Sequence, residues 1–297
     1  MKINTKLKNS CFLDSSLGCF LSLNDFCWNI LSIKTNKENK EMELVTELKD
    51  LIRKKNKNET LDFKKIKEIL GKVNEEYNKN NQEDVNEFIS IFLEQLIKEL
   101  IGKGDKSKKE FHLKEEDKES FNKLQTNFFE KNDSFLLDLF YGRYKLEIKC
   151  LNQHIIKSSF HVFNILTLPH KYTNNFEKLL NYFQDKKKIY EEIICPICHH
   201  NKSYYSVKTL FNLPYYLICY INEQEFDNLK YLNTYNFIKD ENIDNDDIYE
   251  LVGTIPYYVN SNTGHYTYNC IINHDSDIKI NKNVVMVFFE KIKKSNV

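Results

Sequence analysis

Apolar residues in the first third of the chain recur at helical spacing. The runs 44–54 and 61–73 keep a period close to 3.6 residues, and the clearest helix is predicted at 81–102, where Asn81 can cap the first turn. An earlier apolar stripe, with spacings of three, four and seven, comprises Leu13, Leu17, Phe20, Leu21 and Trp28. The first third is therefore predicted to be helical.

From Phe135 onward the pattern changes to short runs rich in β-branched and aromatic residues, which indicate strands. These runs cover 141–150, 159–168, 203–213, 215–221, 249–255, 265–272 and 284–292. One helix is predicted between them, at 174–183, and the mixed-charge stretch 103–120 before them is predicted as a loop. Helices followed by a largely antiparallel set of strands define an α+β fold.

Composition narrows the classes of function. The chain has 297 residues, of which 41% are hydrophobic, and its 43 basic side chains are balanced by 43 acidic ones. A net charge of zero gives no overall attraction to nucleic acid or to an anionic membrane, so neither is expected as a partner. No apolar run approaches the roughly 20 residues of a membrane span. The eight cysteines lack a regular disulfide spacing, which indicates reduced thiols and a cytoplasmic or nuclear protein.

A cysteine and a histidine form the first candidate for chemistry. Cys11 stands at the start of a predicted helix, where the helix dipole makes a thiol easier to ionise, although an isolated free cysteine is more often a core residue. His265 follows Gly264, a residue that leaves room for a substrate backbone, and a neutral imidazole is the usual base for a cysteine nucleophile. Asp275 or Asp277, about ten residues further on, could hold the imidazole in one tautomer.

A second candidate is a metal site. Cys195 and Cys198 form a Cys-x-x-Cys turn, which places two thiolates on one tetrahedral Zn²⁺, although a redox motif and chance remain open for a lone pair. Cys150 and His154 close another strand-like run and offer a second pair of ligands. The sequence therefore predicts a Cys₃His zinc site, with a metal-free hairpin as the alternative.

Six segments, in order, resemble the motifs of the ubiquitin-specific proteases, a family of papain-like cysteine deubiquitinases. The segments are NSCFLDS (9–15), QEDVNEF (82–88), LFYGRYKLEIKC (139–150), LFNLPYYLICYI (210–221), YELVGTI with TGHYTYNC (249–255, 263–270) and VVMVFFEK (284–291). The first resembles the family's N-T-C-Y-M-N-S and the second its Q-Q-D-A-x-E-F. Order and spacing agree from about residue 6 to residue 291.

The resemblance implies one catalytic domain over 1–297, shaped as a right hand. The helical thumb would cover about 1–134, zinc-ribbon-like fingers about 135–220, and an antiparallel β palm about 221–297. It also implies a thiol protease of the ubiquitin conjugation pathway, which hydrolyses the peptide or isopeptide bond after the C-terminal glycine of ubiquitin. Ubiquitin or ubiquitinated proteins, together with a recruiting protein, are the partners expected.

Roles carry over from the family residue by residue. Cys11 falls on the nucleophile, His265 on the base and Asp275 on the orienting acid, with Asp277 in reserve. Asp84 falls on the acidic position that contacts the arginine-rich tail of ubiquitin, where a charge-assisted hydrogen bond would position the tail.

The sequence also departs from the family at identifiable positions. Lys6 occupies the place of the oxyanion-hole asparagine, five residues before the cysteine, and Asn9 is the rival donor. Gln153 stands where the second zinc cysteine is expected, so His154 would substitute for it. Two alternatives to an active deubiquitinase follow: a catalytically weak or inactive ubiquitin-binding scaffold, and a zinc-stapled scaffold unrelated to ubiquitin.

Overall fold

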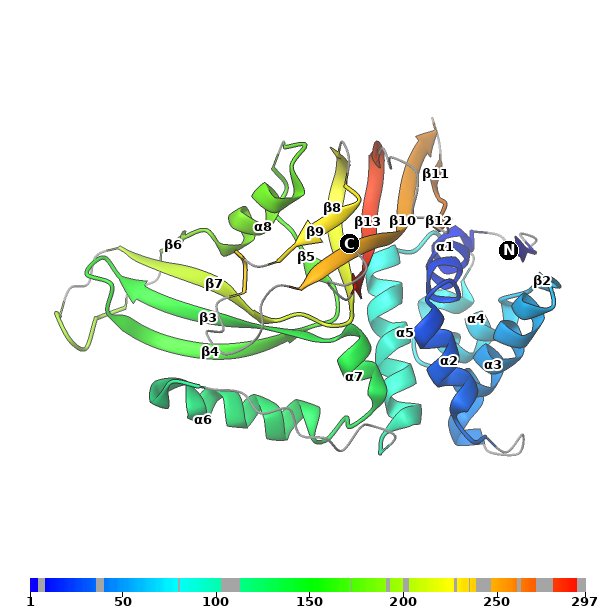
Figure 1. The fold of residues 1–297 in the computed structure, drawn as a ribbon, viewed down its shortest axis with the longest axis horizontal. Coiled ribbons are helices and arrows are strands. Elements are labelled where there is room, and N and C mark those ends of the chain that lie inside the picture. The colour runs from blue at the N-terminus through cyan, green and yellow to red at the C-terminus, as the bar shows by residue number, and fades with distance from the viewer. Residues whose placement is uncertain are drawn as a thin grey trace.

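The elements form three groups, a cluster of helices, a long narrow sheet and a larger sheet that lies between them (Figure 1). The structure is a computed structural model. It describes residues 1–4, 9–35, 40–79, 81–102, 113–171, 173–190, 193–199, 203–226, 229–234, 236–238, 247–260, 263–270 and 280–292. No helix in these ranges combines the length and the apolar character needed to cross a membrane.

The helical group forms from the first third of the chain, as predicted. Its helices are α1 (Cys11–Phe20), α2 (Asn24–Ser32), α3 (Glu43–Asn56), α4 (Lys64–Gly71) and α5 (Val85–Leu100), with 3₁₀ turns at Lys40–Met42 and Glu75–Asn78. A short parallel pair, β1 (Lys2–Ile3) and β2 (Thr60–Leu61), closes its outer edge. The predicted stripe is buried except for Trp28, which is 69% exposed, because the chain turns between α1 and α2.

Helix α1 lies inside the molecule, with nearly every residue buried. The ring of Phe20 in its last turn packs against aromatic rings from three other helices and one strand, with centroids 5.1–5.9 Å apart. These rings belong to Phe26, Phe92, Phe140 and Phe288. Packing from all sides fixes the position of α1 and therefore of its first residue, Cys11.

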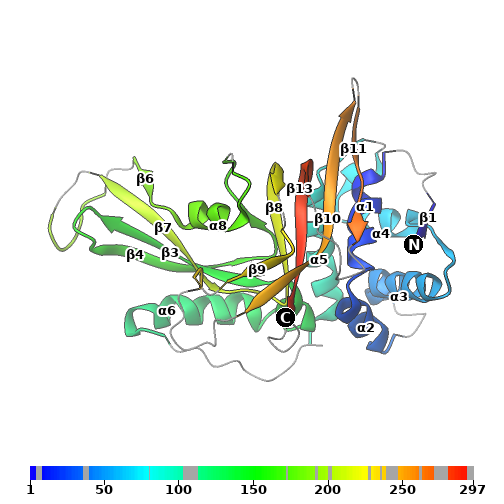
Figure 2. The same ribbon diagram turned by 45° about the horizontal axis from the view of Figure 1, so that its top comes forward.

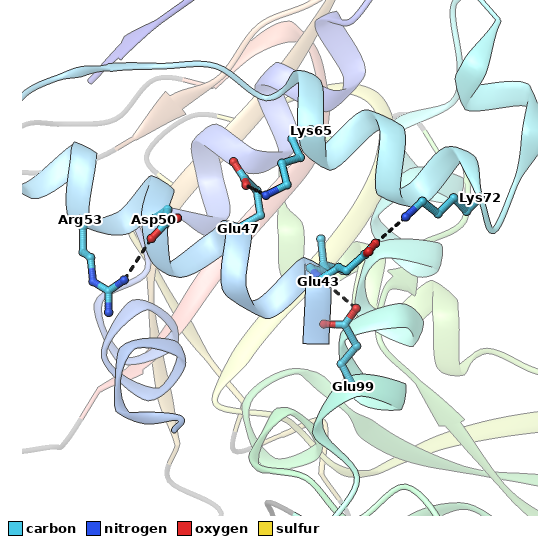
Figure 3. Close-up of polar contacts among 8 residues, drawn as sticks. Glu43, Glu47, Asp50, Arg53, Lys65, Lys72 and Glu99 are labelled. Carbon is cyan, nitrogen blue, oxygen red and sulfur yellow. Dashed lines mark hydrogen bonds and ion pairs between the residues drawn. The ribbon is translucent and has the colours of Figure 1, made fainter. Parts of the chain in front are cut away.

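Polar contacts join the helices of this group (Figure 3). The carboxylate of Glu99 in α5 accepts hydrogen bonds from the backbone N–H groups of Leu44 and Val45, at 3.1 and 2.9 Å, and so caps the start of α3. Burial raises the pKa of Glu99, and the two N–H groups oppose that rise. Lys65 of α4 forms an ion pair with Glu47 of α3, at 2.8 Å, which holds these two helices together at the surface.

The narrow sheet has the strand order β4–β3–β7–β6 and is antiparallel throughout. Its strands are β3 (Gly142–Cys150), β4 (Ile155–Phe163), β6 (Lys187–Ile189) and β7 (Tyr204–Asn212). Helix α6 (Glu115–Leu124) packs along β4, continues as a π-helical turn over Gln125–Phe129, and is followed by α7 (Phe135–Phe140).

The prediction of a loop over 103–120 is wrong for the start of α6. Asp117 on this helix is buried, and its carboxylate accepts hydrogen bonds from Lys145 at 2.7 Å and from Ser158 at 3.1 Å. Phe121 packs against Phe160 of β4, with ring centroids 5.3 Å apart. The charged stretch thus enters a packed helix, because the buried carboxylate of Asp117 has polar partners on the sheet. Residues 103–112 lie outside the described ranges.

The larger sheet has the order β11–β10–β13–β8–β5, and β9 and β12 also pair with β10. Its strands are β5 (Leu166–Thr167), β8 (Tyr216–Phe226), β9 (Tyr231–Asn233), β10 (Ile248–Asn260), β11 (Thr263–Tyr266), β12 (Asn269–Cys270) and β13 (Ile280–Ile292). Helix α8 (Phe176–Gln184) covers a second apolar core on this sheet. The edge that carries β11 and β12 faces the helical group (Figure 2).

Candidate active site

Cys11 is the first residue of α1, as predicted, and its side chain is almost buried, with 9% exposed. The residue before it, Ser10, donates its hydroxyl to the carboxylate of Asp14 at 2.9 Å, across the first turn of the helix. The thiol therefore lies at the positive end of the α1 dipole, where a thiolate is stabilised.

His265 lies in β11, opposite Tyr258 of β10, and its side chain is exposed. Helix α1 contacts both β10 and β11, so the helix that begins with Cys11 packs against the strand that carries His265 (Figure 2). The two residues are 254 positions apart in sequence. The fold brings together the elements that carry the predicted nucleophile and the predicted base.

The residues on either side of His265 form hydrogen bonds with residues at the start of α5. The side-chain amide of Gln82 donates a hydrogen bond to the carbonyl of Gly264, and the hydroxyl of Tyr266 accepts one from the backbone N–H of Val85. The sequence did not predict this arrangement, because neither contact follows from the spacing of the residues. It fixes the path of β11 on either side of the histidine.

The structure gives a reason for glycine at position 264 that the sequence did not show. A Cβ at this position would overlap the hydroxyl of Tyr257, which lies against the strand. The ring of Tyr257 also packs against Tyr266, with centroids 4.6 Å apart. The missing side chain therefore makes room for a tyrosine of the protein itself, and the predicted approach of a substrate backbone stays a prediction.

Asp84 is the N-cap of α5, in place of the predicted Asn81. One oxygen of its carboxylate accepts hydrogen bonds from the backbone N–H groups of Asn86 and Glu87, at 2.8 and 3.1 Å. The side chain is exposed, and its charge acts on Tyr266 of β11. The second carboxylate oxygen of Asp84 accepts no hydrogen bond from a residue in the described ranges.

Asp14, one turn after Cys11, was not singled out from the sequence. One of its oxygens is buried and accepts no hydrogen bond from any residue in the described ranges. Burial raises the pKa of Asp14 from 3.8 to about 6, while the hydroxyl of Ser10 opposes the rise. The one available signal was in the family motif N-T-C-Y-M-N-S, which has asparagine where this chain has Asp14.

Replacing Asp14 with asparagine is expected to stabilise the protein at pH 8 by about 1–2 kcal/mol, since a desolvated charge is removed. Because its pKa is raised on folding, wild-type Asp14 binds its proton more tightly in the native state, so the wild type gains stability as the pH falls from about 7 to about 4. The advantage of Asp14→Asn should therefore shrink over that range. Urea unfolding of both proteins at pH 4.5, 6 and 8 measures this, and a difference independent of pH would contradict it.

The remaining residues predicted for the catalytic site differ in what can be said of them. Asn9 lies two residues before Cys11 and has a left-handed backbone, with φ of 52°, a conformation that asparagine tolerates. Lys6, Asp275 and Asp277 lie outside the described residues.

The four predicted metal ligands come together at the far end of the narrow sheet. The ligand atoms of Cys150, His154, Cys195 and Cys198 all lie within 4.8 Å of one another. The Nδ1 atom of His154 is 3.6 Å from the sulfur of Cys150 and 3.7 Å from that of Cys195, and the sulfurs of Cys150 and Cys198 are 3.9 Å apart. Tetrahedral zinc with Zn–S bonds of about 2.3 Å separates its ligands by about 3.8 Å, so the cluster fits zinc.

Local backbone structure explains the ligand set. Cys150 ends β3 and His154 precedes β4, so the turn between these strands supplies two ligands. Gln153 in that turn has a positive φ of 66°, and its side-chain oxygen accepts a hydrogen bond from Tyr205 at 2.5 Å. The amide is thereby turned away and His154 joins the cluster. The backbone N–H of Cys198 lowers the pKa of Cys195 to about 6, which favours the thiolate that a metal requires.

Comparison with known proteins identifies the family. The sequence model described as ubiquitin carboxyl-terminal hydrolase matches residues 4–295, and the protein belongs to this family. Ubiquitin carboxyl-terminal hydrolase 4 of Vanderwaltozyma polyspora is 23% identical over 189 residues, which are 58% of this chain and 21% of that protein. The chain thus spans about a fifth of the length of that curated relative.

Solved structures show the same fold. A chain in the structure of the SAGA DUB module of Ubp8, Sgf11, Sus1 and Sgf73 bound to monoubiquitin has a similar fold, with a TM-score of 0.72 and 17% identity. The match covers 98% of the present chain and 69% of the chain in that module. The module bound to ubiquitin aldehyde matches the same shares with a TM-score of 0.71 and 18% identity. The right-hand architecture is therefore confirmed: the helical group is the thumb, the narrow sheet the fingers and the larger sheet the palm.

Proposed function

We propose that the protein is an active thiol-dependent deubiquitinase, which hydrolyses the peptide or isopeptide bond after the C-terminal glycine of ubiquitin. The observation that supports this best is the packing of α1, which begins with Cys11, against β11, which carries His265, in a chain of this family. Ubiquitin and ubiquitinated proteins are the proposed substrates. We further propose a single catalytic domain, a cytoplasmic or nuclear location and a recruiting partner.

In the proposed reaction, the thiolate of Cys11 attacks the carbonyl carbon of the terminal glycine. His265 takes the thiol proton and then donates it to the leaving amine, and water hydrolyses the thioester. The backbone N–H of Cys11 and a second donor, Lys6 or its rival Asn9, would donate to the oxyanion. Asp275, or Asp277, would orient the imidazole. Contacts on both sides of His265 support this role, because a base must be held in place.

Substrate recognition is proposed at the start of α5, beside the strand that carries His265. Asp84 uses one carboxylate oxygen to cap α5 and keeps the other for a guanidinium of the arginine-rich ubiquitin tail. In the fingers, Cys150, His154, Cys195 and Cys198 would hold a structural zinc ion, which would tie the β3–β4 turn to the turn that contains Cys195 and Cys198.

Ubiquitin that carries a C-terminal electrophile tests the proposal directly. An active enzyme forms a covalent adduct at Cys11, whereas an inactive ubiquitin-binding scaffold retains ubiquitin in a pull-down without an adduct. A scaffold unrelated to ubiquitin does neither. Parallel reactions with probes made from ubiquitin-like modifiers identify the modifier. An adduct on a cysteine other than Cys11, or the absence of any adduct, contradicts the proposed function.

Gln82 is expected to act as a positioning residue for His265. Gln82→Glu keeps the length of the side chain but removes the donor that faces the Gly264 carbonyl, so kcat should fall by about tenfold with little change in KM, since a displaced base slows the chemical step. Gln82→Lys, which keeps a donor, should recover part of the loss. Steady-state kinetics with a fluorogenic ubiquitin substrate measures both. If Gln82→Glu lowers the unfolding temperature so far that part of the enzyme is unfolded in the assay, the lower kcat reflects a structural role of Gln82 instead.

The oxyanion donor is tested at two positions. A lysine is a poorly fixed donor, and the loss of a well-placed donor costs about 10²–10³ in kcat, so Lys6→Asn should raise turnover by at least about tenfold. If Lys6→Asn has no effect and Asn9→Ala removes most of the turnover, Asn9 is the donor. If both changes are without effect, the predicted alignment over residues 3–11 is wrong.

A further inference from the structure

Two cysteines that the proposed reaction does not use meet beside the catalytic elements. Cys19 lies in the last turn of α1, and its sulfur is 3.9 Å from the carbonyl of Thr254 in β10. Cys270 ends β12, which leads away from the strand of His265, and its sulfur is 2.9 Å from the hydroxyl of Ser22. The sulfur of Cys270 is also 3.7 Å from the carbonyl of Gly18, the residue before Cys19. Cys270 pairs with Gly253, where a Cβ would lie 3.6 Å from the sulfur of Cys19, so the two thiols are neighbours.

The two thiols have opposite properties. The hydrogen bond from Cys19, and next the hydroxyl of Ser22, lower the pKa of Cys270 to about 7, although burial opposes this shift, and Lys55 adds a favourable charge. Cys270 therefore ionises more readily than an ordinary thiol. Cys19 is fully buried, and its pKa is raised well above the ordinary value, so it stays a thiol. A partly exposed, easily ionised thiol thus stands next to a buried one.

Outside the metal cluster, no other pair of cysteines has this combination. Cys27 and Cys219 are buried, and desolvation raises the pKa of each, to about 11 for Cys27. Cys11 is the proposed nucleophile, and the remaining three cysteines belong to the metal cluster. Reactivity of a thiol follows its thiolate character and its exposure, so Cys270 is the thiol outside both sites that an oxidant would reach first.

We propose that Cys270 and Cys19 form a peroxide-sensitive dithiol, whose oxidation to a disulfide ties α1 to β12 and slows catalysis. The thiolate of Cys270 attacks a hydroperoxide, such as H₂O₂, which yields a sulfenic acid and hydroxide. The sulfur of Cys19 then displaces water from the sulfenic acid, and the proton of its thiol goes to the leaving oxygen. Two thiols and one H₂O₂ thus give one disulfide and two waters, a two-electron oxidation. A thiol reductant reverses it.

The disulfide would act on catalysis through tight packing. A sulfur–sulfur bond is about 2 Å long, so the end of α1 and the strand must move closer than hydrogen-bonded thiols require. The ring of Tyr268 already occupies the space beside Gly18, where even a Cβ would lie only 2.8 Å from it, so the elements must slide along each other. A displacement of about 1 Å costs about 100-fold in a well-aligned reaction. This effect on hydrolysis rests on the proposed function; the thiol chemistry does not.

Disulfide formation is tested first, without reference to activity. The zinc-loaded protein is treated at pH 7 with one equivalent of H₂O₂, alkylated, and digested without reduction for mass spectrometry. A peptide pair linked through Cys19 and Cys270 is expected in the wild type and in the matched control Cys27→Ala, and is lost in Cys270→Ser. Cys270 that remains free and alkylated after treatment, or a disulfide to another cysteine, overturns the proposal.

Hydrolysis of a fluorogenic ubiquitin substrate tests the coupling. The oxidised wild type should be at least about tenfold slower than the reduced protein, and dithiothreitol should restore the rate. Cys270→Ser should have the basal rate of the reduced wild type. Any rate that this variant loses after treatment with H₂O₂ measures direct oxidation of Cys11. Equal losses in wild type and Cys270→Ser, with the linked peptide present, overturn the coupling. If the protein never hydrolyses ubiquitin, the proposed function fails. The linked peptide still shows whether Cys19 and Cys270 form a disulfide.

Discussion

Cys11→Ala is expected to abolish hydrolysis of a ubiquitin substrate, with kcat lower by at least about 10⁴-fold, and to abolish labelling by ubiquitin with a C-terminal electrophile. The reason is chemical, because no other group can form the thioester once the sulfur is gone. The fold should remain, since a small side chain is removed from the first turn of a helix that is packed on all sides. Kinetics, probe labelling and the unfolding temperature of the same preparation measure the three effects.

Cys27→Ala is the matched control, because it removes another almost buried thiol from the same helical layer, 16 residues away. It should leave labelling and turnover near the wild-type level. His265→Ala should be nearly as severe as Cys11→Ala, and Asp275→Ala less so, because this acid orients the base and does not react. If Asp277→Ala is the damaging change, Asp277 is the orienting acid. Undiminished labelling of Cys11→Ala would contradict the assignment of Cys11 as the nucleophile.

The family and the fold class followed from the sequence because their signals are local. A cysteine at a helix start, a glycine–histidine pair at a strand and a Cys-x-x-Cys turn each occupy a few residues, and their order along the chain fixed the alignment. The structure brings together the four side chains that were named from the sequence as metal ligands, His154 included, and their binding of a metal stays a prediction. The boundaries at about residues 134 and 220 and the catalytic roles stay predictions.

The features that the sequence hid depend on pairs far apart in the chain. Asp117 was assigned to a loop because its partner, Lys145, lies on a strand 28 residues away. The bond from Gln82 to Gly264 joins residues 182 positions apart, and Cys270 contacts Gly18 across 252. Charge patterning and periodicity describe neighbours along one element, so they carry no information on which element will cover a given side chain.

Asp14 shows a different limit. Its charge is visible in the sequence, but its burial is not, and only burial turns an ordinary helix-start carboxylate into one with a pKa near 6. A carboxylate in the first turn of a helix is normally favourable, because it meets the positive end of the dipole. Here one oxygen has no partner in the described ranges, so desolvation outweighs the dipole. The balance between these two effects requires coordinates.

Cys195→Ala is expected to release one zinc ion per chain and to lower the unfolding temperature by at least about 5 °C, since structural zinc contributes of order 10 kcal/mol to the small hairpins that it closes. Cys195 is the most protected ligand, fully buried beside Tyr204 and Cys150, and its low pKa favours the metal-binding thiolate. Elemental analysis of protein purified without added metal, followed by thermal unfolding, measures both effects.

His199→Ala is the control for the fourth ligand. His199 directly follows Cys198 but is exposed and lies outside the cluster, so this variant should keep its zinc, whereas His154→Ala should lose it. Acid should also release the metal from the wild type and from His199→Ala, because the thiolates must be protonated. Zinc retained in His154→Ala and lost in His199→Ala would move the fourth ligand. A metal-free wild type with the same unfolding temperature as Cys195→Ala would show that packing alone holds the fingertips.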